Sequence, residues 1–195
     1  MSDPWDIPPL VQQGDGTPDA IYRAIGEAVC SWEQVEVRLS WLYGMFTLRW
    51  QEGDRAFREY GGPGSFTARA TKLEAAMEAY RKSHHDQALE GDFTKAISLV
   101  RNFSARRNDI AHSVIGAVDR KSLAIYHQPH MQQLYGGGVD FFLFPPHYRA
   151  KKFDASNLPT YAYSSREISF FNTEFLRLIV PLDDLYWRLR KKHCP

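Results

Sequence analysis

The stretch PDAIYRAIGEAVCSWEQVEVRLSWLYGMFT, residues 18–47, carries the clearest pattern in the chain. Large apolar residues recur in it at steps of three and four, as they do along one face of an α-helix. These residues are Ile21, Ile25, Val29, Trp32, Val35, Leu39, Leu42 and Phe46. A helix of this length extends about 45 Å, which is typical of a main helix of a bundle. Thr17 and Pro18 favour a helix start at this point, because threonine caps helices and proline tolerates the first helical position.

Further stretches with the same periodicity predict the other helices of an all-α, up-and-down bundle. They cover residues 54–60, 66–83, 93–114 and 165–192. We expect Ser65 and Asp92 to cap the second and third of these. Ser164-Ser165-Arg166-Glu167 has the form of a capping box for the last. Pro181 lies inside the last stretch and should kink or break the helix.

The pattern changes between the last two long helices. Residues 122–127 and 139–144 are typical of short strands, with 161–163 as a candidate third strand. We therefore expect a small insertion at about 115–164 that contains a β-hairpin. Residues 1–17, with three prolines and two glycines, are expected to form an N-terminal arm. The remainder, 18–195, is expected to be a single helical domain that includes this insertion.

Composition excludes several classes of protein. The 195 residues are 44% hydrophobic and 24% charged, which is ordinary for a globular domain. The net charge of +1 gives no general field that would attract nucleic acid or a membrane. There is no run of eighteen apolar residues, and the first residues do not resemble a signal peptide. Two cysteines, Cys30 and Cys194, are too few for a disulfide framework, so we expect a cytoplasmic protein.

The third long helix contains an unusual group of polar residues, RNFSARRNDIAH at 101–112. Arg107 falls on an apolar stripe, which comprises Val100, Phe103 and Ala111. We therefore expect Arg107 to be partly buried and to need a partner, because an unpaired buried charge is costly. Glu33 and Glu36 of the first helix are candidates. A purely structural ion pair is one interpretation of this arginine.

A catalytic interpretation uses the same residues. A guanidinium binds phosphate well and keeps its proton, whereas an imidazole exchanges a proton near neutrality. Arg107 and His112 could thus cleave a phosphodiester without metal, with His112 acting on a ribose 2′-hydroxyl or the leaving oxygen. Asn108 lies four residues before His112 and shares its face of the helix. Arg106 and Asp109 are candidates for RNA binding or for support of these groups, as is Glu36.

The segment Arg107-Asn108-Asp109-Ile110-Ala111-His112 resembles the signature of the HEPN superfamily, in which Arg and a polar residue precede His near the end of a long bundle helix. The resemblance implies an all-α bundle that often dimerises. It also implies a metal-independent endoribonuclease that produces a 2′,3′-cyclic phosphate, as in toxin–antitoxin and phage-defence systems. Other members have lost catalysis and bind a protein or RNA partner, which is the alternative function. The insertion is not part of the family pattern.

Helix geometry constrains the catalytic interpretation. Arg107 and His112 lie about 140° apart on a regular helix, at about 100° per residue. Either the helix loosens near Ile110 or a second copy of the chain completes the site. We therefore expect a homodimer with Asn108 and His112 of each chain near the axis, and RNA as the substrate. An antitoxin or another protein is a candidate partner.

The remaining candidate residues carry less information. His84-His85-Asp86 resembles a metal-binding group, but adjacent histidines in a polar stretch are usually solvated. His127, His130 and His147 lack a regular ligand spacing. Tyr161, Tyr163, Phe141 and Phe142 suit either base stacking or a small core. No phosphate-binding, nucleophile-elbow or zinc motif occurs, so neither metal nor cofactor is expected.

Overall fold

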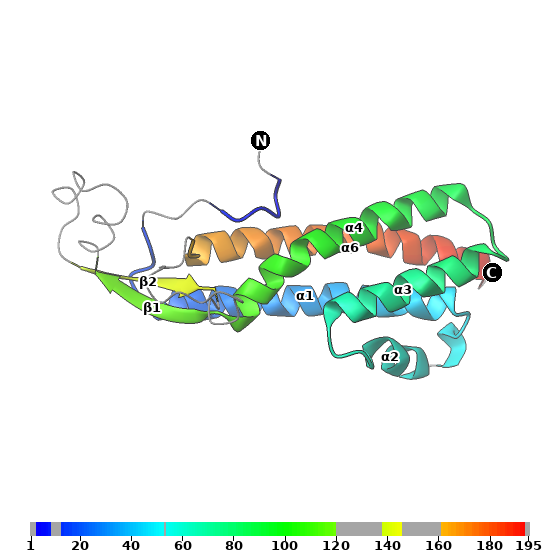
Figure 1. The fold of residues 1–195 in the computed structure, drawn as a ribbon, viewed down its shortest axis with the longest axis horizontal. Coiled ribbons are helices and arrows are strands. Elements are labelled where there is room, and N and C mark those ends of the chain that lie inside the picture. Colours follow the sequence, from blue (N-terminus) through cyan, green and yellow to red (C-terminus); the bar gives the residue numbers. More distant parts are fainter. Residues whose placement is uncertain (1–2, 9–12, 53, 120–137, 146–160, 194–195) are drawn as a thin grey trace, which may run out of the picture. The chain divides into compact units, whose positions relative to one another are not determined.

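The computed structural model describes residues 3–8, 13–52, 54–119, 138–145 and 161–193. The chain divides into two compact units. Residues 1–30 and 106–173 form the first, and residues 31–105 and 174–195 form the second. The elements in chain order (Figure 1) are α1 (Pro18–Phe46), the short 3₁₀ turn η1 (Trp50–Glu52), α2 (Asp54–Gly61), α3 (Phe66–Arg81), α4 (Gln87–His112), β1 (Val114–Asp119), β2 (Val139–Phe144) and α6 (Ser165–His193).

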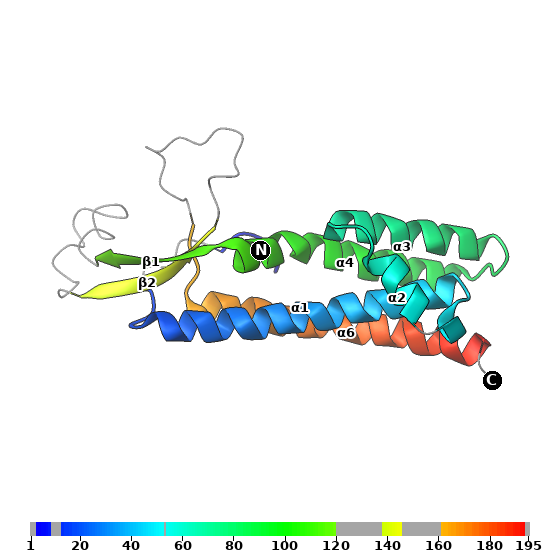
Figure 2. The ribbon, with the colours of Figure 1, turned by 90° about the horizontal axis from the view of Figure 1, so that it is seen from below.

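The chain is mostly helical and has a two-stranded antiparallel hairpin before its last helix, which confirms the predicted fold class. β1 follows directly from the end of α4 (Figure 2), and Val114 pairs with Phe144 at the start of the hairpin. The predicted strand at 139–144 is confirmed, but its partner is residues 114–119; we expected Val114 to end the preceding helix and residues 115–119 to lie in the insertion outside its strands. Val114, Ile115 and Val118 are β-branched and favour strand over helix. The predicted strand at 122–127 lies outside the described residues.

The other edge of β2 is joined by two single residues. Asp15 of the N-terminal arm exchanges backbone hydrogen bonds of 3.0 and 2.9 Å with Phe141. Tyr163 exchanges bonds of 2.8 and 2.9 Å with Leu143, so the third strand expected at 161–163 is reduced to a single bridge. Asp15 also accepts the backbone N–H of Ser165 at 2.7 Å. The arm is thus attached both to the hairpin and to the start of α6.

The helix termini agree with the sequence except at α4. The capping box is confirmed, because Ser164 N–H donates to Glu167 at 2.9 Å and Arg166 N–H donates to Ser164 Oγ at 3.2 Å. α4 begins at Gln87 rather than at 93, and its capping carboxylate is Asp86, which accepts the N–H of Leu89 at 3.0 Å. The predicted cap Asp92 instead lies within this helix.

α6 continues through Pro181 without a break. Leu178, Leu182 and Leu185 are buried on either side of the proline, and their packing offsets the backbone hydrogen bond that proline removes. No helix in the described part of the chain combines the length and apolar composition needed to cross a membrane.

The core of the second unit forms around Trp32. Its ring makes edge contacts with Phe66 at 5.3 Å and with Phe175 at 5.1 Å between centroids.

The predicted inward positions of α1 are largely confirmed, and buried examples are Ile21, Val35, Leu39, Leu42 and Phe46. Ile25 and Val29 are only half-buried.

Candidate functional site at the end of α4

The last two turns of α4 bury an arginine, and it is Arg106. The buried stripe of the helix includes Phe103, Arg106 and Ile110, and Arg106 is only 7% exposed. Arg107, which we expected on this stripe, is half-buried on the adjacent side of the helix. The desolvation free energy of a buried guanidinium is therefore larger for Arg106 than for Arg107.

Arg106 is held by a compact polar cluster. Its Nη2 lies 3.1 Å from Asp109 Oδ2, and its guanidinium carbon lies 5.9 Å from the centre of the Tyr161 ring. The same Asp109 oxygen accepts hydrogen bonds from the hydroxyl of Tyr163 at 2.9 Å and from that of Tyr161 at 3.2 Å. One carboxylate thus joins the end of α4 to the segment before α6.

The electrostatics of the two tyrosines follow from this arrangement. Burial, and then the negative charge of Asp109, raise the pKa of both Tyr161 and Tyr163. Both phenols therefore remain protonated and act as donors to the carboxylate at neutral pH. Tyr163 is fully buried, so the stacking of a base on its ring, one of the two uses expected for it, is sterically excluded.

Asp109 also helps to end the helix. Its backbone carbonyl accepts the side-chain hydroxyl of Ser113, the residue between α4 and β1. This contact satisfies one of the carbonyls that a helix leaves unpaired at its C-terminus. Asp109 is therefore held by two sets of contacts, the hydroxyl of Ser113 on its carbonyl and the tyrosine hydroxyls on its carboxylate.

Two other residues of the motif face solvent, whereas Arg107 is half-buried and its Nε is enclosed. Asn108 and His112 are exposed and stand four residues apart on α4. Arg107 Nη1 donates to Asn108 Oδ1 at 3.2 Å, which draws the guanidinium towards the side of the helix that carries Asn108. α4 remains a regular α-helix through His112, so the helix does not loosen at Ile110.

Glu36, one of the two carboxylates suggested as a partner of Arg107, is bound within the second unit. Arg69 donates to it from Nη2 at 2.6 Å and from Nε at 3.1 Å. The hydroxyl of Tyr60 donates to it at 2.9 Å and the indole N–H of Trp32 at 3.3 Å. We did not predict this buried group, although Tyr60 and Arg69 both lie in stretches that the sequence predicts to be helical.

The histidine-rich candidates have other environments. His84 stacks on Tyr80 with ring centroids 4.5 Å apart, and the Tyr80 hydroxyl lies 2.7 Å from Nε2 of His193. Within the described ranges no three His, Cys, Asp or Glu side chains come together in a way that would hold a metal ion. His127, His130 and His147 lie outside those ranges.

Comparison of the chain with protein-family models, with curated proteins and with solved structures finds no significant match.

Proposed function

We propose that this chain is a metal-independent endoribonuclease of the HEPN type, with Arg107, Asn108 and His112 at its active site. The observation that carries the proposal is the hydrogen bond of 3.2 Å from Arg107 to Asn108. It brings a phosphate-binding guanidinium to the exposed side that Asn108 shares with His112. Arg107 thereby lies beside the exposed face that carries the amide of Asn108 and the imidazole of His112.

The proposed reaction needs a base and an acid. One imidazole of His112 takes the proton of the ribose 2′-hydroxyl, whose oxygen attacks the adjacent phosphorus. The bond from phosphorus to the 5′-oxygen breaks, and that oxygen takes a proton from a second, protonated imidazole. Arg107 stabilises the negative charge that grows on the phosphate. The products are a 2′,3′-cyclic phosphate and a 5′-hydroxyl.

A second copy of the chain supplies what one copy lacks. Because α4 is regular through His112, Arg107 and His112 leave the helix about 140° apart. A two-fold dimer that places the two motifs face to face would provide both imidazoles and an arginine from each side. Asp109 and Arg106, which contact each other and the tyrosines, act in this proposal as support and not as RNA ligands.

The experiment is cleavage of mixed cellular RNA by the purified chain in EDTA. We expect His112→Ala and Arg107→Ala to lose most of the cleavage, and His85→Ala to retain it. His85 is a suitable control because it is another exposed histidine, with a side chain 80% accessible. Equal cleavage by all four proteins would assign the activity to a contaminant and refute the proposal. Growth arrest on expression, relieved by His112→Ala, would support a toxin or phage-defence role.

An inactive binding module is the second candidate. The specific observation in its favour is that Arg106 and Asp109 are engaged in packing. If Arg107→Ala lowers the melting temperature by several degrees and no variant alters RNA, the motif is structural.

A further inference from the structure

The outer face of α6 carries a tryptophan that the fold does not bury. Trp187 is 51% exposed, whereas Leu185 and Leu189, on the opposite side of the helix, are buried in the core. The guanidinium carbon of Arg190 lies 5.1 Å from the centre of the Trp187 ring. Tryptophan and arginine are enriched among the residues that contribute most to protein interfaces.

Contacts within the second unit hold this tryptophan in place. The rings of Trp187 and Tyr186 have centroids 5.3 Å apart, and Tyr186 lies equally far from Trp41 of α1. Arg38 of α1 lies over the Trp41 ring at 5.1 Å, and its Nε donates to Asp183 of α6 at 3.3 Å. The surface is thus continuous from α6 to α1 and fixed before any partner binds, which lowers the entropy lost on binding. Asp183 can accept a further donor, because a carboxylate has several acceptor sites.

The charges around Trp187 stand in a mirrored order along the helix. Asp183 and Asp184 precede it by four and three residues, and Arg190 and Lys191 follow it by three and four. At about 100° per residue, all four lie within about 60° of Trp187 around the helix. Asp183 and Arg190 fall on one side of it, and Asp184 and Lys191 fall on the other. Each side therefore has one carboxylate before the tryptophan and one cation after it.

Such an order of charges is complementary to itself. In a two-fold dimer with antiparallel copies of α6, residues before Trp187 in one copy face residues after it in the other. Asp183 then meets Arg190 of the second copy, and Asp184 meets Lys191 of the second copy, with the two tryptophans side by side at the axis. A centre shifted by one turn towards the start of α6 would instead place carboxylates opposite carboxylates, which is unfavourable.

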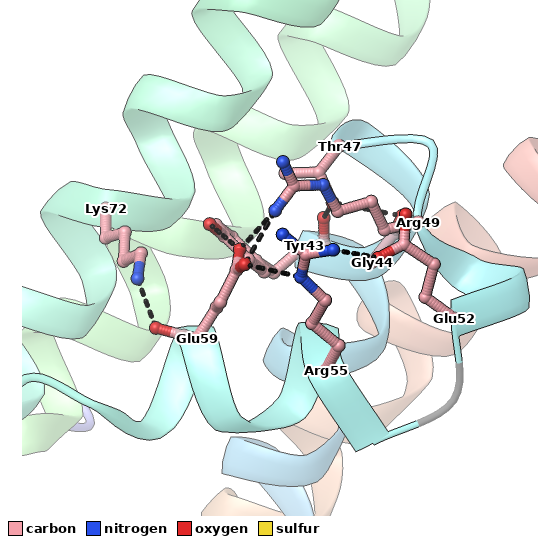
Figure 3. A network of polar contacts seen from close by, with 8 residues as sticks. All are labelled: Tyr43, Gly44, Thr47, Arg49, Glu52, Arg55, Glu59 and Lys72. Atoms are coloured by element: carbon pink, nitrogen blue, oxygen red, sulfur yellow. Dashed lines mark hydrogen bonds and ion pairs between the residues drawn. The ribbon is translucent and has the colours of Figure 1, made fainter.

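The charges that would meet across the axis are available for a partner. Asp184 and Lys191 are exposed, and neither forms an ion pair within the part of the chain that the structure describes. The segment between α1 and α3 is different, because its charges are paired internally (Figure 3). There the Glu59 carboxylate accepts Arg49 Nη1 at 2.6 and 2.7 Å and Arg55 Nε at 3.2 Å.

We propose that the face of α6 around Trp187 is a two-fold interface with a second copy of this chain. Burial of the tryptophans supplies most of the affinity, and the ion pairs select the antiparallel register. The contact of two single helices is small, so we expect a dissociation constant of about 10–100 µM. These residues belong to the second unit and the motif at the end of α4 belongs to the first. The interface is therefore distinct from the dimer contact expected for catalysis and does not rest on the nuclease activity.

The test exchanges the charges of Asp184 and Lys191 in the full chain. Asp184→Lys places lysines opposite each other across the axis, and Lys191→Asp places aspartates opposite each other. Sedimentation velocity at about 1–100 µM should show the dissociation constant of each variant raised about tenfold or more. An equimolar mixture of the two variants restores both attractive pairs in a mixed dimer, so its association should return to that of the unsubstituted chain. Trp187→Ala should weaken association about tenfold.

Lys95→Asp is the matched control, because it makes the same change of charge at an exposed position of α4. It should leave association unchanged, and all these variants should keep the melting temperature because their side chains are exposed. Three results would overturn the proposal: equal average mass of the unsubstituted chain and the single charge variants at every concentration, a mixture as dissociated as its components, or an equal effect of Lys95→Asp. None of these measurements involves RNA cleavage, so failure of this interface and failure of the proposed function are distinguishable.

Discussion

Replacement of Asp109 by alanine tests the architecture of the candidate site most directly. It removes the ion-pair partner that lies 3.1 Å from Arg106 and the acceptor shared by two tyrosine hydroxyls. Loss of one member of a buried ion pair costs about 3–5 kcal/mol. Arg106 is 7% exposed, and its Nε and Nη1 have no hydrogen-bond partner among the described residues. Water therefore offers little compensation to the guanidinium.

The magnitude for the variant follows from these contacts. We expect Asp109→Ala to lower the free energy of unfolding by about 4 kcal/mol, with the orphaned tyrosine hydroxyl at Tyr163 contributing to the loss. For a chain of this size the melting temperature should fall by roughly 10 °C. Tyr161→Phe removes one hydrogen bond at a half-exposed position, so it should cost only about 1 kcal/mol. Circular dichroism during urea and thermal unfolding measures both.

A double-mutant cycle separates the ion pair from other effects. Arg106→Met combined with Asp109→Leu removes both charges, so the double variant should be more stable than the sum of the single losses predicts. A loss below about 1 kcal/mol for Asp109→Ala, or additive losses in the cycle, would show that the pair is already solvated and that our account of the cluster is wrong.

Three further predictions concern other parts of the chain. Glu36→Gln removes the charge that a bidentate arginine faces in the second unit, and we expect a loss of about 3 kcal/mol in urea unfolding; a negligible change would contradict the burial of this pair. Burial, followed by the charge of a neighbouring imidazole, lowers the pKa of His193. The unfolded chain therefore binds a proton first as the pH falls below about 6.5, so stability should decrease below that pH and decrease less in His193→Gln; a parallel pH dependence in both proteins would refute this. A Cβ at Gly116 would lie 2.8 Å from the ring of Phe144, so Gly116→Ala should lower stability by about 1–3 kcal/mol in thermal melts, whereas an unchanged melt would mean that the ring moves aside freely.

Hydrophobic periodicity predicted the helices because their burial repeats along the sequence. The start of α4 was misplaced because Asp86 and Asp92 are both capable caps, and the turn between them has a single large apolar residue, Leu89, to show that the helix has begun. The strand at 114–119 was missed for a related reason. Val114 continues the helical spacing from Ile110, and only the pairing with residues 139–144 selects the extended conformation.

The candidate site was less predictable because its decisive contacts are distant in sequence. Arg106 and Arg107 lie three and four residues after Phe103, so either satisfies the helical period. The choice is made by Asp109 and by tyrosines that follow it more than fifty residues later. The pairing of Glu36 depends in the same way on Arg69, thirty-three positions away. Local spacing cannot show either partner.

The sequence analysis considered a structural and a catalytic role for Arg107 alone, and the structure offers two adjacent arginines for these roles. Arg106 satisfies the structural interpretation, because it is buried and paired with Asp109. Arg107 keeps its contact to Asn108 on the exposed side of the helix, as the proposed chemistry requires. A structural arginine at this point is therefore no argument against a catalytic one. The structural and the catalytic interpretations exclude each other only if one arginine has to serve both purposes. Substitutions of Arg106 or Asp109 should thus mainly lower stability. Substitutions of Arg107 or His112 should mainly lower RNA cleavage.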